Sequence, residues 1–214
     1  MYMSLKKINE ENIAKAISDF ESAVDFEFVP VITPKSSYVE HVQWILSLMF
    51  LLLFVGCIDA VFYNSWGDKT YYYLAAPFVA IILGTLLDKS DLVDRFFISK
   101  KERERQVLEK AQRIFFLNHL DKVKSRNSLL LFISVLEKQI VLLPDPNIEK
   151  LSLEQTHALS QKALVILQKN FKSKKYEDGL IETIKMLKNE LEIHFPRRSN
   201  SENHVANKLI WWNE

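Results

Sequence analysis

The pattern of charge along this 214-residue chain singles out two apolar segments. Val42–Ile58 and Tyr71–Leu87 each contain 17 residues without a charged side chain. A helix of that length spans about 25 Å, close to the roughly 30 Å thickness of the hydrocarbon core of a bilayer. Because the first segment has no polar face, we interpret both segments as membrane-spanning helices rather than as buried helices of a soluble protein.

The stretch between the two segments has the composition of a tight turn at a membrane surface. Asn64, Ser65 and Gly67 favour a turn. Around them lie aromatic residues of the kind found at the level of lipid headgroups: Tyr63, Trp66 and Tyr71–Tyr73. The sequence therefore predicts a two-helix hairpin, with the acidic residue Asp59 near its loop and within reach of water.

Lysine and arginine residues predict the orientation of this hairpin. The loop contains Lys69 alone, whereas seven basic residues flank the outer ends: Lys35, Lys89, Arg95, Lys100, Lys101, Arg103 and Arg105. Basic residues are enriched in the cytoplasmic flanks of membrane helices. We therefore predict a two-pass protein whose soluble domain and both termini are cytoplasmic.

A helix and a strand are predicted before the hairpin. Asn9 can cap an amphipathic helix over Asn9–Val24, whose apolar positions fall on one stripe. Phe26–Thr33 is rich in aromatic and β-branched residues, which favour a strand. Since Pro30 has no backbone N–H, we predict that this strand lies at an edge of its sheet.

Two strands and three helices are predicted after the hairpin. Ser128–Ser134 is a continuous apolar run, typical of a strand buried on both faces. Gln139–Leu143 follows as its partner in a β-hairpin. The helices are a basic one over Lys100–Leu120, one opened by a capping box of Ser152 and Gln155, and one from Tyr176 to near Pro196.

Neither soluble piece can bury a core by itself. The one helix and one strand before the hairpin are too few to bury a core. The two strands after it would leave the edges of their sheet unpaired. We therefore predict an α/β protein with a single discontinuous α/β/α domain that a two-helix transmembrane hairpin interrupts. Residues 1–40 supply the first helix and strand, 41–88 the hairpin, and 89–214 a basic juxtamembrane helix and the rest of the domain.

Several segments resemble motifs of the TPM domain family, in its membrane-embedded bacterial branch. Glu21–Tyr38 is similar to E-x-x-T-x-[AG]-E-I-V-P-V-I followed by S-x-Y. Ser128–Ser134 resembles G-V-L-I-F-V-S, and Val135–Ile148 resembles A-E-R-x-V-x-V-L-x-D-x-G-I. Asp178–Ile184 resembles D-G-L-x-x-A-I, and the tail resembles H-F-P at His194–Arg198 and N-E-L-P-N-x-L-I at Asn203–Ile210.

The resemblance covers nearly the whole chain and implies a TPM-like domain in a bacterial inner membrane. The chain departs from the family pattern at Val24 and Val123, where threonine is common, and at Ser128 and Asn147, where glycine is. These positions fall near the predicted ends of the sheet, where α/β domains bind ligands. We therefore expect a protein that has no catalytic activity, and we identify no candidate catalytic residue.

Relatives in that family suggest two functions. Some are linked to photosystem repair or modulate a membrane receptor, and others are described as acid phosphatases or calcium binders. The first hypothesis is a membrane-anchored, non-catalytic TPM-like binding module that assists or regulates a membrane-protein partner. The alternative is a divalent-metal-dependent, phosphatase-like hydrolase, in which carboxylates hold a cation that activates water.

Glu27, Glu137 and Asp145 are the candidate metal ligands, because each matches a position of a family motif. The alternative hypothesis requires a divalent cation such as calcium, whereas the first requires no cofactor. Each residue also has a structural interpretation. Glu27 can belong to a polar strand face, Glu137 to a hairpin turn, and Asp145 to a turn between two prolines. The sequence leaves both interpretations open.

Composition argues against several other classes of protein. The net charge of +1 does not suit a nucleic-acid binder, which presents a strongly basic face. Cys57 is the single cysteine and lies in an apolar segment, so it forms no intramolecular disulfide and no cysteine-based metal motif. The sequence contains no P-loop, G-x-G-x-x-G, H-E-x-x-H or G-x-S-x-G motif. The expected partners are the lipid bilayer and another membrane protein.

Overall fold

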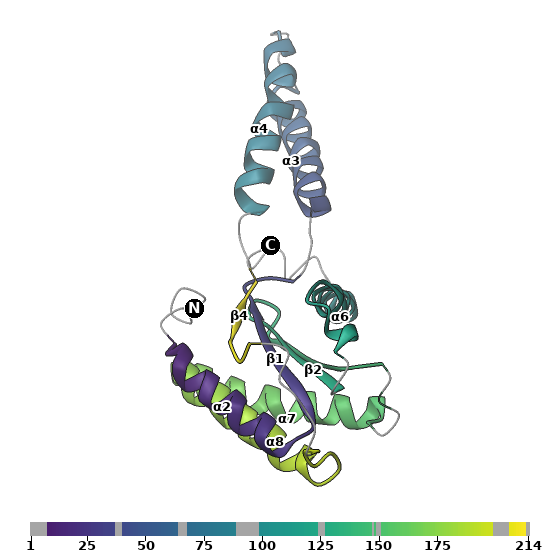
Figure 1. Ribbon diagram of the computed structural model, residues 1–214. Coiled ribbons are helices and arrows are strands. Elements are labelled where there is room, and N and C mark those ends of the chain that lie inside the picture. Colours follow the sequence, from purple (N-terminus) through teal and green to yellow (C-terminus); the bar gives the residue numbers. More distant parts are fainter. Residues whose placement is uncertain are drawn as a thin grey trace. The chain divides into compact units, whose positions relative to one another are not determined.

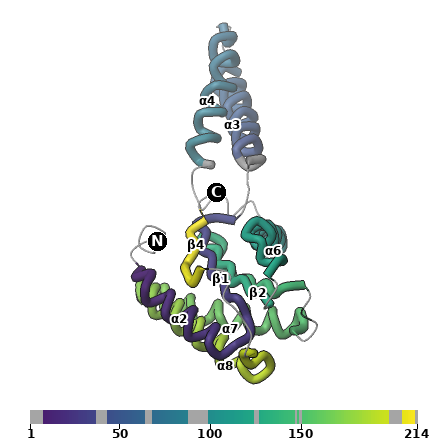
Figure 2. The backbone as a smooth tube through the Cα atoms, in the orientation of Figure 1, coloured from purple at the N-terminus to yellow at the C-terminus, as the bar shows by residue number. Residues whose placement is uncertain are grey.

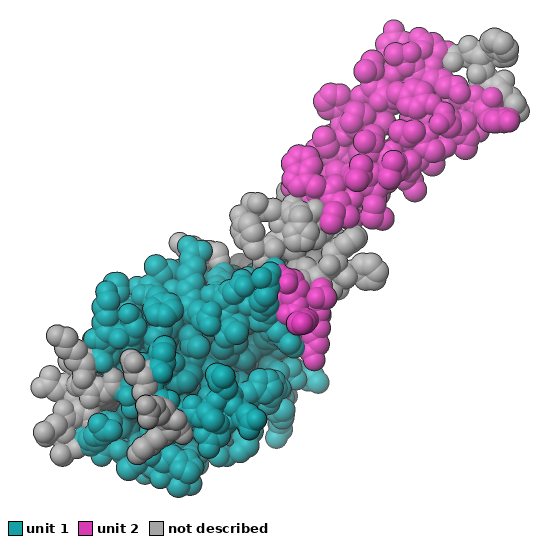
Figure 3. Space-filling view, turned by 90° about the vertical axis from the view of Figure 1, so that its right-hand side faces the viewer, with its two compact units in different colours: residues 1–36, 104–214 teal, residues 37–103 magenta. Residues whose placement is uncertain are grey.

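The computed structural model describes residues 8–36, 40–63, 68–88, 99–123, 127–146, 148, 151–198 and 206–212. Within these ranges the chain is a mixed α/β protein with six α-helices and a four-stranded sheet. It divides into an α/β unit, residues 1–36 with 104–214, and a hairpin unit, residues 37–103 (Figure 3). The predicted turn residues Asn64, Ser65 and Gly67, and Asn147, lie outside the described residues.

The sheet of the α/β unit has the strand order β3-β2-β1-β4. Figure 2 shows β4, β1 and β2 side by side. β1 (Phe26–Thr33) and β2 (Asn127–Ser134) pair in parallel. β3 (Gln139–Pro144) runs antiparallel to β2, and β4 (Ile210–Trp211) runs parallel to β1. The three strands expected from the sequence are confirmed to within a residue at each end, whereas β4 was not predicted.

Helices cover both faces of this sheet (Figure 1). α2 (Glu10–Ala23), α7 (Leu153–Lys172) and α8 (Tyr176–Glu192) pack on one face, and α6 (Lys100–Leu117) packs on the other. Successive residues of a strand point to opposite faces. Each strand residue from Ser128 to Ser134 is therefore buried, as the continuous apolar run predicted.

Hydrogen bonds at the helix ends confirm the predicted caps. The Asn9 side chain accepts from the Glu11 N–H at the start of α2. Ser152 and Gln155 form both hydrogen bonds of a capping box at the start of α7. α6 ends before Leu120 because His119 adopts a left-handed conformation, with φ of 54°, which a continuing helix does not allow.

The prediction that Pro30 marks an edge strand is wrong, because β1 lies between β2 and β4. The N–H of Phe28 points away from β2 and donates to the carboxylate of Glu21. Backbone groups alternate along a strand, so Pro30 faces the same side as Phe28. β4 pairs with β1 only from Val31 onward. Proline is tolerated here because β4 does not pair with it.

The hairpin unit contains α3 (Glu40–Val61) and α4 (Thr70–Asp88). By length and composition, the spans Gln43–Val61 and Thr70–Leu87 could cross a membrane. Large apolar side chains on them are exposed, with Leu52 at 66% and Phe78 at 69%. Asp68 precedes α4 and accepts from the Thr70 N–H at 2.9 Å. Hydrogen bonds from Thr70 hold the pKa of Asp68 below its usual value.

Small residues form the contact between α3 and α4. Ala76, Ala80 and Gly84 recur every fourth residue of α4, and Ala76 and Ala80 are buried. A Cβ atom on Gly84 would lie 2.2 Å from the Oγ of Ser47 on α3, so the two backbones approach closely there. The spacing of Ala76, Ala80 and Gly84 is typical of helices that associate in membranes. Nearer the loop, the Tyr73 hydroxyl donates to the carboxylate of Asp59.

Candidate functional site

A buried polar cluster lies where the parallel strands β1 and β2 end. We call it the serine–glutamate cluster: Ser36, Ser134 and Glu137. The Ser36 N–H donates to both carboxylate oxygens of Glu137, at 3.1 and 3.2 Å. The Ser134 hydroxyl also donates to Glu137, and the Oγ atoms of the two serines are 2.7 Å apart. The segment after β1 and the β2–β3 turn therefore meet at one carboxylate.

The turn between β2 and β3 brings Glu137 to this position. The Val135 N–H donates to the Thr33 carbonyl at 3.1 Å, and the Leu136 N–H donates to the Pro34 carbonyl at 3.0 Å. These bonds extend the pairing of β1 with β2 beyond the strand ends. Lys138 then adopts a left-handed conformation, with φ of 53°, and the chain reverses into β3.

The carboxylate of Glu137 holds the segment after β1 against the β2–β3 turn. It is 101 residues from Ser36 in the sequence and accepts hydrogen bonds from protein groups on both sides. A buried carboxylate without such donors would be costly. The geometry thus gives Glu137 a structural role, which agrees with its interpretation as a turn residue.

Glu27 and Asp145 lie at the other end of the strands. Glu27 is fully buried and pairs in register with Ser128. Asp145 is 6% exposed, and its N–H donates to the Ser128 carbonyl at 2.8 Å. The Ser128 hydroxyl donates to the Leu120 carbonyl at 2.7 Å. Both acids therefore adjoin Ser128.

The three candidate metal ligands do not lie together. Ser128 and Ser134 are six residues apart along β2, which corresponds to about 20 Å at about 3.3 Å per residue. Glu27 and Asp145 are at the first of these residues and Glu137 is beyond the second. Among the described residues, no group of three or more His, Cys, Asp or Glu is placed to hold a metal ion. The set does not fit one calcium ion.

Two buried acids near the start of β1 were missed from the sequence. Glu21 accepts from the Phe28 N–H at 2.9 Å, and Asp25 lies 3.2 Å from the guanidinium of Arg198. Glu21 follows Ile17 by four residues and so falls on the buried stripe of α2. That spacing could have identified it. Arg198 contacts Asp25, which is far from it in the sequence, so no local signal identifies its role.

A pocket of about 330 Å³ lies between α7 and the β2–β3 hairpin; we call it the α7 pocket. Most of its wall is apolar, and polar residues complete it. The lining residues are Ile133, Ser134, Val135, Lys138, Gln139, Ile140, Leu164, Leu167, Gln168, Phe171 and Lys172. The pocket has no local signal in the sequence, because it depends on the packing of a helix against a hairpin that is distant in the sequence.

Comparison with known proteins supports the fold alone. No family model and no curated protein matches the chain. A search of solved structures finds the NMR structure of the BA42 protein from the psychrophilic bacterium Bizionia argentinensis, with a TM-score of 0.54. The match covers 96% of this chain and 96% of that one, at 15% sequence identity. At this identity the likeness extends to the fold and carries no functional assignment.

Proposed function

We propose that this protein is a membrane-anchored, non-catalytic binding module that assists or regulates a membrane-protein partner. The observation that carries the proposal is the surface of the hairpin unit. Its large apolar side chains face outward, while its small residues Ala76, Ala80 and Gly84 lie toward α3. Outward apolar side chains suit lipid, because water would make so large an apolar surface unfavourable.

The soluble part is proposed to be one TPM-like domain that the hairpin interrupts. β1 precedes the hairpin in the sequence and β2 follows it, yet they pair over eight residues. Residues of the motif-like segments also contact one another. Ser36, Ser134 and Glu137 form the serine–glutamate cluster, and the Phe195 ring is 5.0 Å from that of Phe26. These contacts support the proposal that the short motif-like segments belong to one domain.

A second candidate function, the metal-dependent hydrolase, is favoured by one observation. Glu27 and Asp145 both adjoin Ser128. Glu137, the third candidate ligand, lies at the opposite end of β2, so the three carboxylates do not converge on one ion. The binding module is therefore the better proposal, because it requires only a rigid domain held at a membrane and a surface for its partner.

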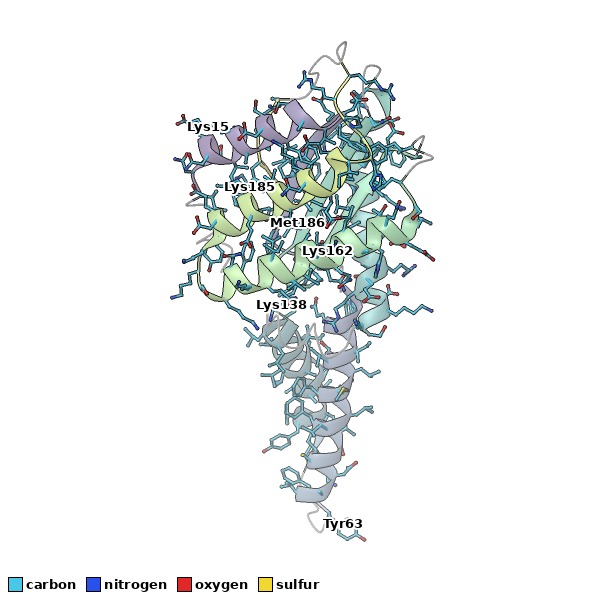
Figure 4. The ribbon with its side chains drawn as sticks, turned by 90° about the horizontal axis from the view of Figure 1, so that it is seen from below. Lys15, Tyr63, Lys138, Lys162, Lys185 and Met186 are labelled. Carbon is cyan, nitrogen blue, oxygen red and sulfur yellow. The ribbon has the colours of Figure 1, made fainter. Side chains whose placement is uncertain are left out.

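The orientation of the protein in the bilayer provides the test. The basic residues that flank the hairpin favour an α/β unit and termini in the cytoplasm of a bacterium. In a Cys57→Ala background, Tyr63→Cys and Lys185→Cys provide two exposed positions (Figure 4). An impermeant thiol reagent should label Tyr63→Cys in intact cells and Lys185→Cys only after permeabilisation. Labelling of both in intact cells, or extraction of the protein by carbonate, would contradict the proposal.

Partner binding is tested separately by cross-linking in intact membranes, followed by purification of the tagged full chain. We expect a membrane protein at a constant ratio to the bait. A bait limited to residues 37–103 is the matched control, because it contains the hairpin unit and lacks the α/β unit. Equal recovery of every partner with both baits would contradict the proposal that the α/β unit selects the partner.

A further inference from the structure

We propose that the α7 pocket binds a medium-chain fatty acid, with its carboxylate held by Lys138 and Lys172. This inference goes beyond the proposed anchoring function, because it concerns a site built entirely within the α/β unit. It assigns a ligand to a pocket that partner binding does not require.

The wall of the pocket suits an alkyl chain. Ile133 and Ile140 face each other across β2 and β3, and both are buried in the core. Leu164, Leu167 and Phe171 supply the opposite wall from the second half of α7. These five side chains offer contacts to the methylene groups of an alkyl chain, whose burial away from water is favourable.

The charge of the rim suits an acid. Lys138 and Lys172 are the charged lining residues, and no aspartate or glutamate lines the pocket. Both lysines are exposed, and neither forms an ion pair within the described part of the chain. Lys169, Lys174 and Lys175 are also exposed around the end of α7. Their positive charge exceeds the roughly half negative charge of the helix C-terminus.

The size of the pocket selects the class of ligand. Ligand pockets span about 300–1,000 Å³, so 330 Å³ is near the lower limit. Such a volume accommodates one short acyl chain and is too small for a phospholipid with two chains. A nucleotide would need more polar partners for its base and sugar than two glutamines and a serine provide. A single chain with one anionic end fits both the wall and the rim.

Photolabelling of the full chain in phosphatidylcholine nanodiscs tests the proposal. The probe is decanoic acid with an aliphatic diazirine, and the labelled peptides are identified by mass spectrometry. We expect labels on residues 164–172 and 133–140, which unlabelled decanoate removes and decanol does not. Labels on α3 and α4 report the probe dissolved in lipid. Labels confined to α3 and α4, or equal competition by decanol, would overturn the assignment.

Variants separate the role of the two lysines from general charge. Lys138→Asn with Lys172→Gln should lower labelling of the pocket about three- to tenfold relative to labelling of α3 and α4. Asn suits the left-handed backbone at position 138, so the turn is retained. Lys15→Gln with Lys185→Gln removes the same charge from α2 and α8, away from the pocket lining, and Figure 4 shows Lys138 and Lys185 on opposite sides of α7. An equal decrease in both double variants would contradict the proposed carboxylate site.

A third variant tests the apolar wall. Leu164→Trp fills the pocket and should abolish its label while the melting temperature of the chain stays within a few degrees. Undiminished labelling in this variant would overturn the proposal. The test of the pocket is independent of the test of membrane anchoring. Label in the pocket without any on α3 and α4 would support the fatty-acid site and contradict the membrane hairpin.

Discussion

The hairpin unit and the α/β unit distribute their side chains in opposite ways. In the α/β unit, large side chains such as Phe20, Phe26 and Phe132 are fully buried. In the hairpin unit, Phe78 is 69% exposed, whereas Ala80 is 1% exposed. The buried side chains are therefore mostly large in the α/β unit and mostly small in the hairpin unit. The α/β unit is stabilised by removal of apolar surface from water, whereas small residues let the two backbones of the hairpin unit approach closely, as in helices that associate in membranes.

Acidic groups, by contrast, accept hydrogen bonds from protein donors in both units. In the α/β unit, Glu21 and Glu137 are buried and accept backbone N–H groups. In the hairpin unit, Asp59 accepts from the Tyr73 hydroxyl across the two helices. Each of these three acids accepts a hydrogen bond from another residue of the chain and so has a structural role. The following substitutions test this comparison.

The largest expected effect is on the core of the α/β unit. Phe28→Asp would place a charge next to Phe20, whose ring is 4.6 Å from that of Phe28. A buried unpaired charge costs several kcal/mol, comparable to the whole stability of a domain, about 5–15 kcal/mol. We expect rapid proteolysis of residues 104–214 in isolated membranes. The control Leu153→Asp, at a position 89% exposed, should leave the digestion pattern unchanged.

An effect of about 2–4 kcal/mol is expected for Glu137→Ala. It removes the acceptor of the Ser36 N–H and the Ser134 hydroxyl, and each buried donor left without a partner costs about 1–3 kcal/mol. Chemical denaturation monitored by tryptophan fluorescence measures the loss. Glu137→Gln keeps one acceptor oxygen and should lose less. Glu192→Ala, at an exposed position, should be neutral. An unaffected Glu137→Ala protein would mean that the cluster does not hold the segment after β1.

Packing within the hairpin unit should respond to Gly84→Leu, with an effect of about 1–3 kcal/mol from overpacking. The added side chain would overlap Ser47, so α3 and α4 must move apart. Spin labels at Ile45 and Leu86, both exposed, report the separation in nanodiscs. Gly56→Leu is the matched control, because nothing lies within 4 Å of a Cβ at Gly56. Equal widening in both variants would show that Gly84 has no special role.

The sequence was sufficient for the elements whose signals are local. The strand Phe26–Thr33, the capping box at Ser152 and the apolar spans are visible in composition and spacing. β4 was missed because Ile210–Trp211 is only two residues long and carries no periodic pattern. The Pro30 prediction failed because an edge was assumed to run the full length of a strand, whereas β4 covers only the later part of β1.

The candidate site was less predictable than the fold, because it consists of long-range contacts. The turn position of Glu137 could be read locally, but its bond to Ser36 joins residues 101 apart. A motif match placed Glu27, Glu137 and Asp145 in one set without regard to strand direction. The register puts the first and last near Ser128 and Glu137 at the opposite end. Sequence identifies the residue types, and only the pairing of β1 with β2 decides which of them meet.

The smallest expected effect is on hydrolysis of phosphate esters, where we predict no activity above background. Glu27 and Asp145 adjoin Ser128, but Glu137 is too distant to complete a ligand set. A chromogenic ester with magnesium, calcium or manganese, and then with chelator, measures turnover by the purified chain. Metal-dependent turnover that Asp145→Asn abolishes, with an unchanged melting temperature, would overturn the binding-module proposal. Calcium that raises the melting temperature without turnover would instead indicate an ion that binds the folded state preferentially. Loss of that increase in Asp145→Asn, but not in Glu137→Gln, would locate the ion at the Ser128 end of the sheet.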